Sequence, residues 1–115
     1  MRFVSHAKAR MFCGVLFAGL LCLAGMPLRA QDTGEALFKS KCAMCHGPDG
    51  DGKTKMGEML KVVDLRSPEV QKQTDAELAQ AITKGKNKMP AYEGKLAKDQ
   101  ITKLVAYVRE IGKKH

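Results

Sequence analysis

The sequence predicts one small all-α domain of three or four short helices joined by long loops. Apolar residues recur at helical spacing in three stretches of the chain, and no stretch alternates in the manner of a β-strand. The 115 residues suffice for a single domain, and no internal repeat or long linker divides them.

The first 30 residues differ from the rest and are interpreted as a cleaved signal peptide. Basic residues at the start precede a nearly all-apolar run over residues 11–25, and we expect cleavage after Ala30. A permanent membrane anchor is the alternative, but a spanning helix needs roughly 20 apolar residues, and this run is shorter. The functional domain is then residues 31–115, and the periplasm is its expected location.

The net charge of the whole chain is +8, and half of it lies in this N-terminal segment. Removing the four basic residues of the segment leaves 16 basic residues against 12 acidic ones, a net charge of +4. The basic character of the whole chain is therefore no indication of nucleic-acid binding.

The first helix of the domain is predicted over residues 32–41. Leu37 and Phe38 lie on one side of it, and Gly34 lies one turn before Phe38. This helix leads the chain directly to a pair of cysteines.

A loop-rich stretch follows the cysteines. Residues 47–55 are dense in Gly, Pro, Asp and Lys, a composition typical of a tight loop. Val62, Val63 and Leu65 are the next expected apolar contacts, and Pro68 is expected to open a short helical turn.

The middle helix is predicted over residues 75–84 because Thr74 and Glu77 have the spacing of a capping box. It is expected to bury Leu78, Ala81 and Ile82 and to end at Gly85. A polar loop then leads to Met89 and Pro90, where proline keeps the preceding residue extended.

The last helix is predicted over residues 98–111, with Tyr107 flanking its apolar stripe. The residues that form this stripe at helical spacing are Ile101, Leu104, Val105 and Val108. A domain of this size buries a modest core, so we expect a cofactor or a covalent staple to stabilise it.

The chemistry of the sequence lies in residues 42–46, which read CxxCH, the attachment signature of c-type haem. On a helical turn Cys42 and Cys45 share a face, so both thiols can form thioethers with the vinyl groups of one porphyrin. The imidazole of His46 then lies where it can bind the iron.

Other uses of these residues are weaker. A zinc site built on Cys42, Cys45 and His46 lacks a nearby fourth ligand, because the other His or Cys of the domain is His115 at the terminus. A thioredoxin-like pair would need a βαβ context, which the sequence does not predict. A disulfide between the two cysteines would close a small ring and restrict little of the chain.

Residues 32–112 resemble a class I monohaem c-type cytochrome of the small bacterial type. The resemblance rests on CxxCH after a helix with Gly34 and Phe38, on the Met89–Pro90 pair, and on a closing helix with Leu104 and Tyr107. It implies a cytochrome c fold around one covalently bound haem c. It also implies that the first and last helices cross closely, with Gly34 permitting the approach while Phe38 and Tyr107 pack around it.

One departure from the family pattern concerns the group that orients the haem-binding histidine. The family often has a proline after the haem histidine whose carbonyl orients the imidazole. The prolines of residues 31–115 are Pro48, Pro68 and Pro90, so the sequence identifies no such acceptor for His46.

The sixth ligand of the iron is expected to be Met89, which lies far along the chain and matches the family position. Met44 lies inside CxxCH and points the wrong way, while Met56 and Met59 are expected to pack in the core or a loop. His115 as the ligand, or an open iron site, remains the alternative.

These residues predict a carrier of single electrons between exported redox proteins rather than an enzyme. A peroxidase or gas sensor with an open iron site is one alternative, and a subunit of a larger redox complex is another. We expect a monomer whose redox partners have an acidic docking surface, because lysines surround the Met89 loop and precede the cysteines. These lysines are Lys39, Lys41, Lys84, Lys86, Lys88 and Lys95.

Overall fold

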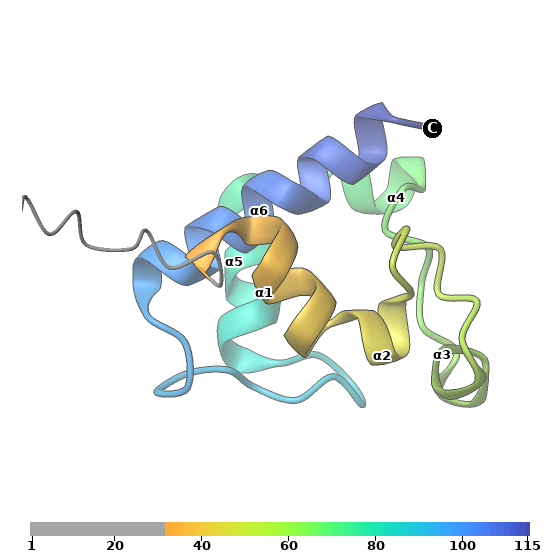
Figure 1. The fold of residues 1–115 in the computed structure, drawn as a ribbon, viewed down its shortest axis with the longest axis horizontal. Coiled ribbons are helices and arrows are strands. Elements are labelled where there is room, and N and C mark those ends of the chain that lie inside the picture. Colours follow the sequence, from red (N-terminus) through yellow and green to blue (C-terminus); the bar gives the residue numbers. More distant parts are fainter. Residues whose placement is uncertain (1–31) are drawn as a thin grey trace, which may run out of the picture.

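The computed structural model describes residues 32–115, so the expected signal peptide and its cleavage site lie outside the described residues. The described residues form six helices (Figure 1). In chain order they are α1 (Gly34–Lys41), α2 (Ala43–His46), α3 (Lys55–Leu60), α4 (Pro68–Gln71), α5 (Asp75–Lys84) and α6 (Lys98–Lys113). The all-α prediction is confirmed. The predicted number of three or four helices is too low. The single turns α2 and α4 count as helices, and the sequence predicts no helix at α3.

The first and last long helices cross, with α1 lying across α6 in Figure 1. A Cβ atom at Gly34 would collide with the carbonyl oxygen of Lys103 and would lie 3.1 Å from the Cβ of Tyr107. The rings of Phe38 and Tyr107 pack beside this point, with centroids 5.3 Å apart. The predicted close crossing is therefore confirmed, and it depends on the missing side chain of Gly34.

Apolar side chains from both ends of the domain form one core under this crossing. Its buried residues are Leu37, Phe38, Val70, Leu78, Ile82, Leu96, Ile101, Leu104, Val105, Tyr107, Val108 and Ile111. Phe38 and Leu104 are each 1% exposed and lie at its centre. The helical stripe predicted for α6 is buried as expected, and Tyr107 joins it.

Helix α5 has the predicted bounds because both of its ends are encoded locally. The Thr74 hydroxyl accepts a hydrogen bond from the Glu77 amide, and the Glu77 carboxylate accepts one from the Thr74 amide at 2.7 Å. Gly85 ends the helix with φ of 75°. The expected burial of Ala81 is wrong, because Ala81 is only half-buried.

The segment between α2 and α5 contains more structure than predicted. Helix α3 begins at Lys55, where the loop was expected to end, and Thr54 caps it. The expected apolar contacts hold only in part: Leu65 packs against the core, whereas Val63 is 50% exposed. The short turn predicted at Pro68 is confirmed as α4.

Candidate cofactor site

The CxxCH residues lie on a helical turn that continues α1 after a break of one residue. The Cys42 amide donates to the Phe38 carbonyl at 2.8 Å, and the amides of Cys45 and His46 both donate to the Cys42 carbonyl. Cys42 and Cys45 are both free and half-buried, one turn apart on the same side. This placement presents two thiols side by side, as thioether attachment to one planar group requires.

Burial sets the protonation of these side chains. Burial, with a smaller contribution from Cys45, raises the pKa of the Cys42 thiol to about 11, so this thiol is neutral at pH 7. Burial also lowers the pKa of His46. The imidazole is therefore neutral near pH 7, which is the form that binds a metal.

The imidazole of His46 is also short of a partner. Its Nδ1 is buried and accepts or donates no hydrogen bond within the described residues. A buried polar atom without a partner costs about 1–3 kcal/mol. A bond to iron through one ring nitrogen and a hydrogen bond through the other are what such a ring needs, so His46 fits a haem ligand.

The second predicted ligand, Met89, lies in a compact loop after α5. The amide of Met89 donates to the Lys86 carbonyl at 2.9 Å, and the Lys86 amide returns a bond to Met89 at 3.3 Å. Asn87, between them, has a positive φ of 54°, which an asparagine tolerates in a tight turn. Met89 is half-buried and packs against the same apolar core as Cys42. A hydrogen bond from the Tyr92 hydroxyl to the Lys41 carbonyl, at 3.0 Å, joins the segment after Met89 to the segment before Cys42.

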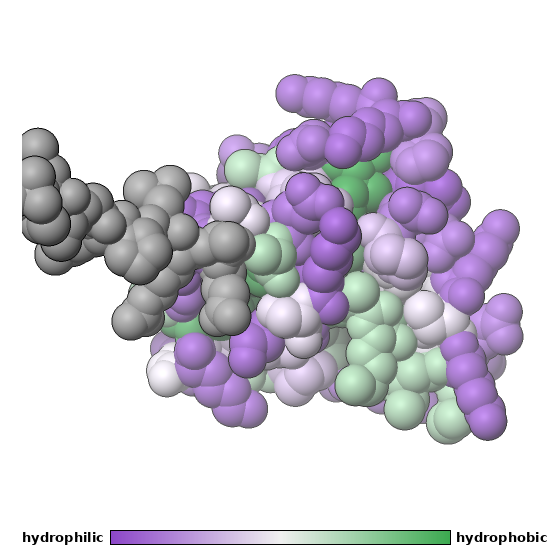
Figure 2. Space-filling view, in the orientation of Figure 1, coloured by the Kyte–Doolittle hydropathy of each residue, from purple (hydrophilic) through white to green (hydrophobic). Residues whose placement is uncertain are grey.

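The remaining methionines are all exposed. Met44 is 75% exposed and Met59 is 61% exposed, while Met56 is 37% exposed. The prediction that Met56 and Met59 pack in the core or a loop is therefore wrong for these side chains. Together with Val63 they give the α2–α3 side of the domain an apolar surface, visible as pale green atoms at the lower right of Figure 2.

His115, the alternative sixth ligand, is exposed at the C-terminus beyond α6. In Figure 1 this end of the chain lies at the top of the view and α2 lies toward the bottom. Met89 packs against the core that Cys42 contacts, whereas His115 is exposed.

Two residues that support the CxxCH turn were missed from the sequence. The Thr54 hydroxyl lies 2.8 Å from the Met44 carbonyl oxygen and 3.0 Å from that of Cys45, and it also accepts a bond from the Gly57 amide. A Cβ at Gly57 would collide with the Cys45 carbonyl oxygen. A helix signal in the sequence could have revealed α3: Thr54 precedes Met56, and Met59 and Leu60 follow Met56 by three and four positions.

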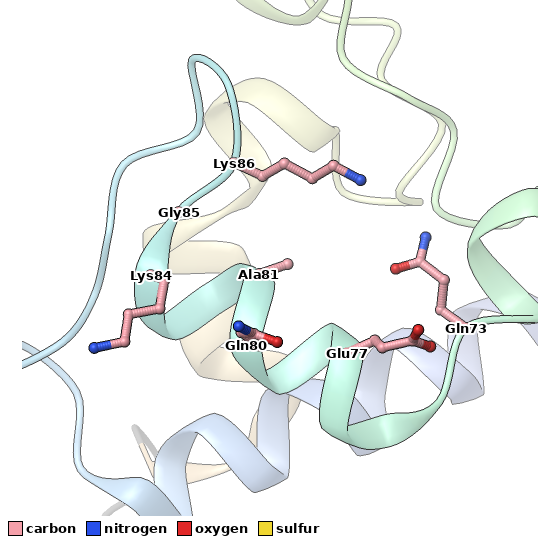
Figure 3. Close-up of a pocket in the computed structure, with 7 residues that line it drawn as sticks. All are labelled: Gln73, Glu77, Gln80, Ala81, Lys84, Gly85 and Lys86. Carbon is pink, nitrogen blue, oxygen red and sulfur yellow. The ribbon is translucent and has the colours of Figure 1, made fainter.

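An open depression of about 380 Å³ runs along α5. Its lining residues are Gln73, Glu77, Gln80, Ala81, Lys84, Gly85 and Lys86. In Figure 3 the side chains of Gln73, Ala81 and Lys86 point toward the same side of α5, whereas Lys84 points away. Five of these seven residues are polar or charged, and none is one of the four predicted ligand residues, so the depression is not by itself the cofactor site.

The alternatives to haem attachment find no support in the described residues. Within residues 32–115, no three His, Cys, Asp or Glu side chains come together as a metal ion would require. The same residues contain one isolated β-bridge, between Lys86 and Met89, and no strand of a βαβ unit. A structural zinc site and a thioredoxin-like site are therefore both disfavoured.

Comparison with known proteins identifies related cytochromes. Residues 29–108 match the family model described as cytochrome C oxidase, cbb3-type, subunit III. A cytochrome c6 of Nostoc sp. is 37% identical over 84 residues, covering 71% of this chain and 73% of that protein. A cytochrome c6 of Synechocystis sp. is 28% identical over 103 residues, covering 89% of this chain and 83% of that protein.

Two further comparisons concern a longer protein and a solved structure. The cbb3-type cytochrome c oxidase subunit FixP of Bradyrhizobium diazoefficiens is 31% identical over 96 residues, and the match covers 31% of FixP. The chain thus spans about a third of that protein. The solved structure of the KustC0563 c-type cytochrome superposes with a TM-score of 0.64 at 31% identity, over 69% of this chain and 96% of that one.

Proposed function

The chain belongs to the class I monohaem c-type cytochromes, and on that premise we propose that it carries single electrons on a haem c attached to Cys42 and Cys45. His46 and Met89 are the residues that would bind its iron. When bound, the haem supplies a one-electron couple between ferric and ferrous iron. The observation that carries the ligand assignment is that Cys42 and Met89 pack against one core although 47 positions separate them.

The proposed ligand set favours electron transfer over catalysis. The imidazole of His46 and the thioether of Met89 would both bind the iron, which would leave a substrate no free position on the metal. A thioether also favours the ferrous state more than a second imidazole would, which raises the reduction potential. The domain then changes little between its two oxidation states, as a carrier requires.

The two alternative functions receive less support. A peroxidase or gas sensor requires an open iron position, whereas Met89 lies in a loop held close to the CxxCH segment. A role as a subunit of a larger complex is suggested by the similarity to FixP, but cytochromes c6 match over most of their own length. The carrier is therefore the function that we propose.

The absorption spectrum of the haem-loaded protein tests the ligands. Replacing Met89 by Ala should remove the weak red band of sulfur ligation and lower the reduction potential, because the iron loses its thioether. Met59→Ala removes an exposed methionine and should change neither property. A Met89→Ala protein with the spectrum and potential of the wild type would exclude Met89 as the ligand.

Covalent attachment needs its own test. After co-expression with a cytochrome maturation system, acid–acetone treatment should leave the haem on the wild-type chain, since thioethers survive this treatment. A Cys42→Ala, Cys45→Ala double variant should lose its colour. Colourless wild-type protein would contradict the attachment.

Exposed lysines near the Met89 loop are the proposed docking surface for an acidic redox partner. Lys41, Lys86, Lys88 and Lys95 are exposed, and no ion pair forms at any of them among the described residues. The other two predicted lysines are already paired, Lys39 with Glu35 and Lys84 with Glu93. The steering surface is therefore smaller than the sequence predicts.

We also propose export to the periplasm by a signal peptide over residues 1–30, and function as a monomer. Among residues 32–115, no helix has the length and apolar character to cross a membrane. The mass of the protein isolated from the periplasm tests the cleavage, since a chain starting at Gln31 is expected. Size-exclusion chromatography with light scattering tests the monomer.

A further inference from the structure

Tyr92 forms a hydrogen bond between the two segments that carry the proposed ligands. Its hydroxyl donates to the carbonyl oxygen of Lys41 at 3.0 Å, across 51 positions of the sequence. Lys41 is the last residue of α1 and directly precedes Cys42, whereas Tyr92 lies three residues after Met89. Among the described residues, this is the hydrogen bond that joins the loop over 85–93 to the segment over 34–46.

The acceptor of this bond is a carbonyl at a helix end. The last carbonyls of α1 have no donor within the helix, and they need one from elsewhere. Tyr92 supplies a donor to one of them from a half-buried position, with its ring against the core. The bond thus satisfies the end of α1 and holds the loop at the same time.

The other hydrogen bonds at the base of the loop go to α5. The Tyr92 amide donates to the Ile82 carbonyl at 3.1 Å, and the Glu93 amide donates to the Thr83 carbonyl at 3.0 Å. The Lys84 ammonium adds an exposed ion pair with Glu93 at 2.7 Å. These contacts fix the base of the loop on α5, so the Tyr92 hydroxyl decides how firmly the loop is held against the CxxCH segment.

We infer that Tyr92 is a positioning residue that holds the Met89 loop against the end of α1 and so resists displacement of the sixth ligand. The inference rests on the proposed function, because it takes His46 and Met89 as the ligands. A net hydrogen bond of ordinary strength changes a local equilibrium by roughly threefold to tenfold. Loss of the hydroxyl should therefore raise the fraction of molecules with Met89 off the iron by that factor.

Binding of imidazole to the ferric haem-loaded protein measures this fraction, because imidazole occupies the position that Met89 leaves. Tyr92→Phe removes only the hydroxyl and should bind imidazole roughly threefold to tenfold more tightly, with its sulfur band present but weaker. Tyr107→Phe is the matched control, since it removes a hydroxyl from a ring that packs on Phe38 in the helix crossing. Wild-type imidazole affinity in Tyr92→Phe would overturn the inference.

Amide hydrogen exchange separates this inference from the ligand assignment. Tyr92→Phe should speed exchange of the Met89 and Lys86 amides relative to amides inside α5, whatever binds the iron. If exchange is unchanged, the positioning role of Tyr92 is wrong. If exchange accelerates while Met89→Ala leaves the spectrum unaltered, the positioning contact stands and the assignment of Met89 as ligand fails.

Discussion

The rings of Phe38 and Tyr107 meet with their centroids 5.3 Å apart and their planes inclined by 54°. This tilted arrangement is favourable for aromatic pairs. It lies at the crossing of α1 and α6, where Gly34 lets the helices approach, and Phe38 also lies 6.4 Å from the His46 ring. The crossing therefore supports both the core and the start of the CxxCH segment.

Replacing Gly34 by Ala should destabilise the domain at this crossing. The new Cβ would collide with the backbone carbonyl of Lys103, which cannot move aside as a side chain can. Overpacking of this kind costs about 1–3 kcal/mol of unfolding free energy. Urea unfolding of the haem-loaded protein measures the loss.

The control for this change is Ser40→Ala, on the exposed side of the same helix. An exposed substitution of this kind should stay within about 0.5 kcal/mol of the wild type. Equal stability of Gly34→Ala and Ser40→Ala would mean that the helices do not need the close approach.

The long helices were predictable because their signals are local. Thr74, Glu77 and Gly85 mark both ends of α5 within a dozen residues, and the bounds follow from them. Helix α3 was missed because a short helix gains most of its stability from tertiary contacts, here the bonds from Thr54 to carbonyls ten and nine positions earlier. The helical periodicity also predicts that the Ala81 side chain is buried, whereas the structure shows it half-buried.

In the candidate site, too, local patterns identify some residues and not others. CxxCH is contiguous, so its three residues could be named from the sequence. Met89 could be named as a ligand only through the family resemblance, and the contact of Tyr92 with Lys41 spans 51 positions that no local pattern connects. The pairing of Lys84 with Glu93 in the following loop likewise appears only in the structure, whereas Glu35 and Lys39 have the i,i+4 spacing of a helical ion pair.

Thr54 should matter more for stability than an exposed loop threonine does. Thr54→Val removes the cap of α3 and the contact with the Met44 carbonyl, and a lost N-cap costs about 0.5–2 kcal/mol. Thr54→Ser keeps the hydroxyl and should retain most of the stability. Thermal unfolding of both variants decides this, and a Thr54→Val protein as stable as the wild type would show that the hydroxyl does not contribute.

The Asp64 carboxylate should make part of the stability depend on pH. Hydrogen bonds from the Arg66 side chain lower the pKa of Asp64 to about 2, through contacts of 2.8 and 2.9 Å. In the unfolded chain an aspartate titrates near about 3.9. Because the folded pKa is the lower one, the contribution is complete above the unfolded value and is lost as pH falls toward 2.

Asp64→Asn should accordingly be less stable than the wild type at pH 7, by an amount that shrinks between about pH 4 and pH 2. The pair is partly exposed, so the difference at pH 7 should be about 1 kcal/mol or less. Urea unfolding at several pH values measures it. A difference that stays constant down to pH 2 would show that the carboxylate charge is not responsible.

The unpaired lysines should speed electron transfer with anionic reagents. Ferricyanide is a suitable oxidant for the reduced protein, since it is small and strongly negative. The rate constant should fall as salt rises, because salt screens the attraction to Lys86 and Lys88 beside the Met89 loop. A Lys86→Gln, Lys88→Gln double variant should react roughly two- to fivefold more slowly at low ionic strength and should lose much of the salt dependence.

The matched control is Lys98→Gln with Lys113→Gln, which removes the same charge from the two ends of α6. If position matters, this control keeps a rate constant close to that of the wild type, because its lysines lie away from the Met89 loop in sequence and on another element. Equal slowing in both double variants would mean that net charge alone steers the reagent. In that case Lys86 and Lys88 would not form a docking surface, and the partner contact would have to be sought on another face.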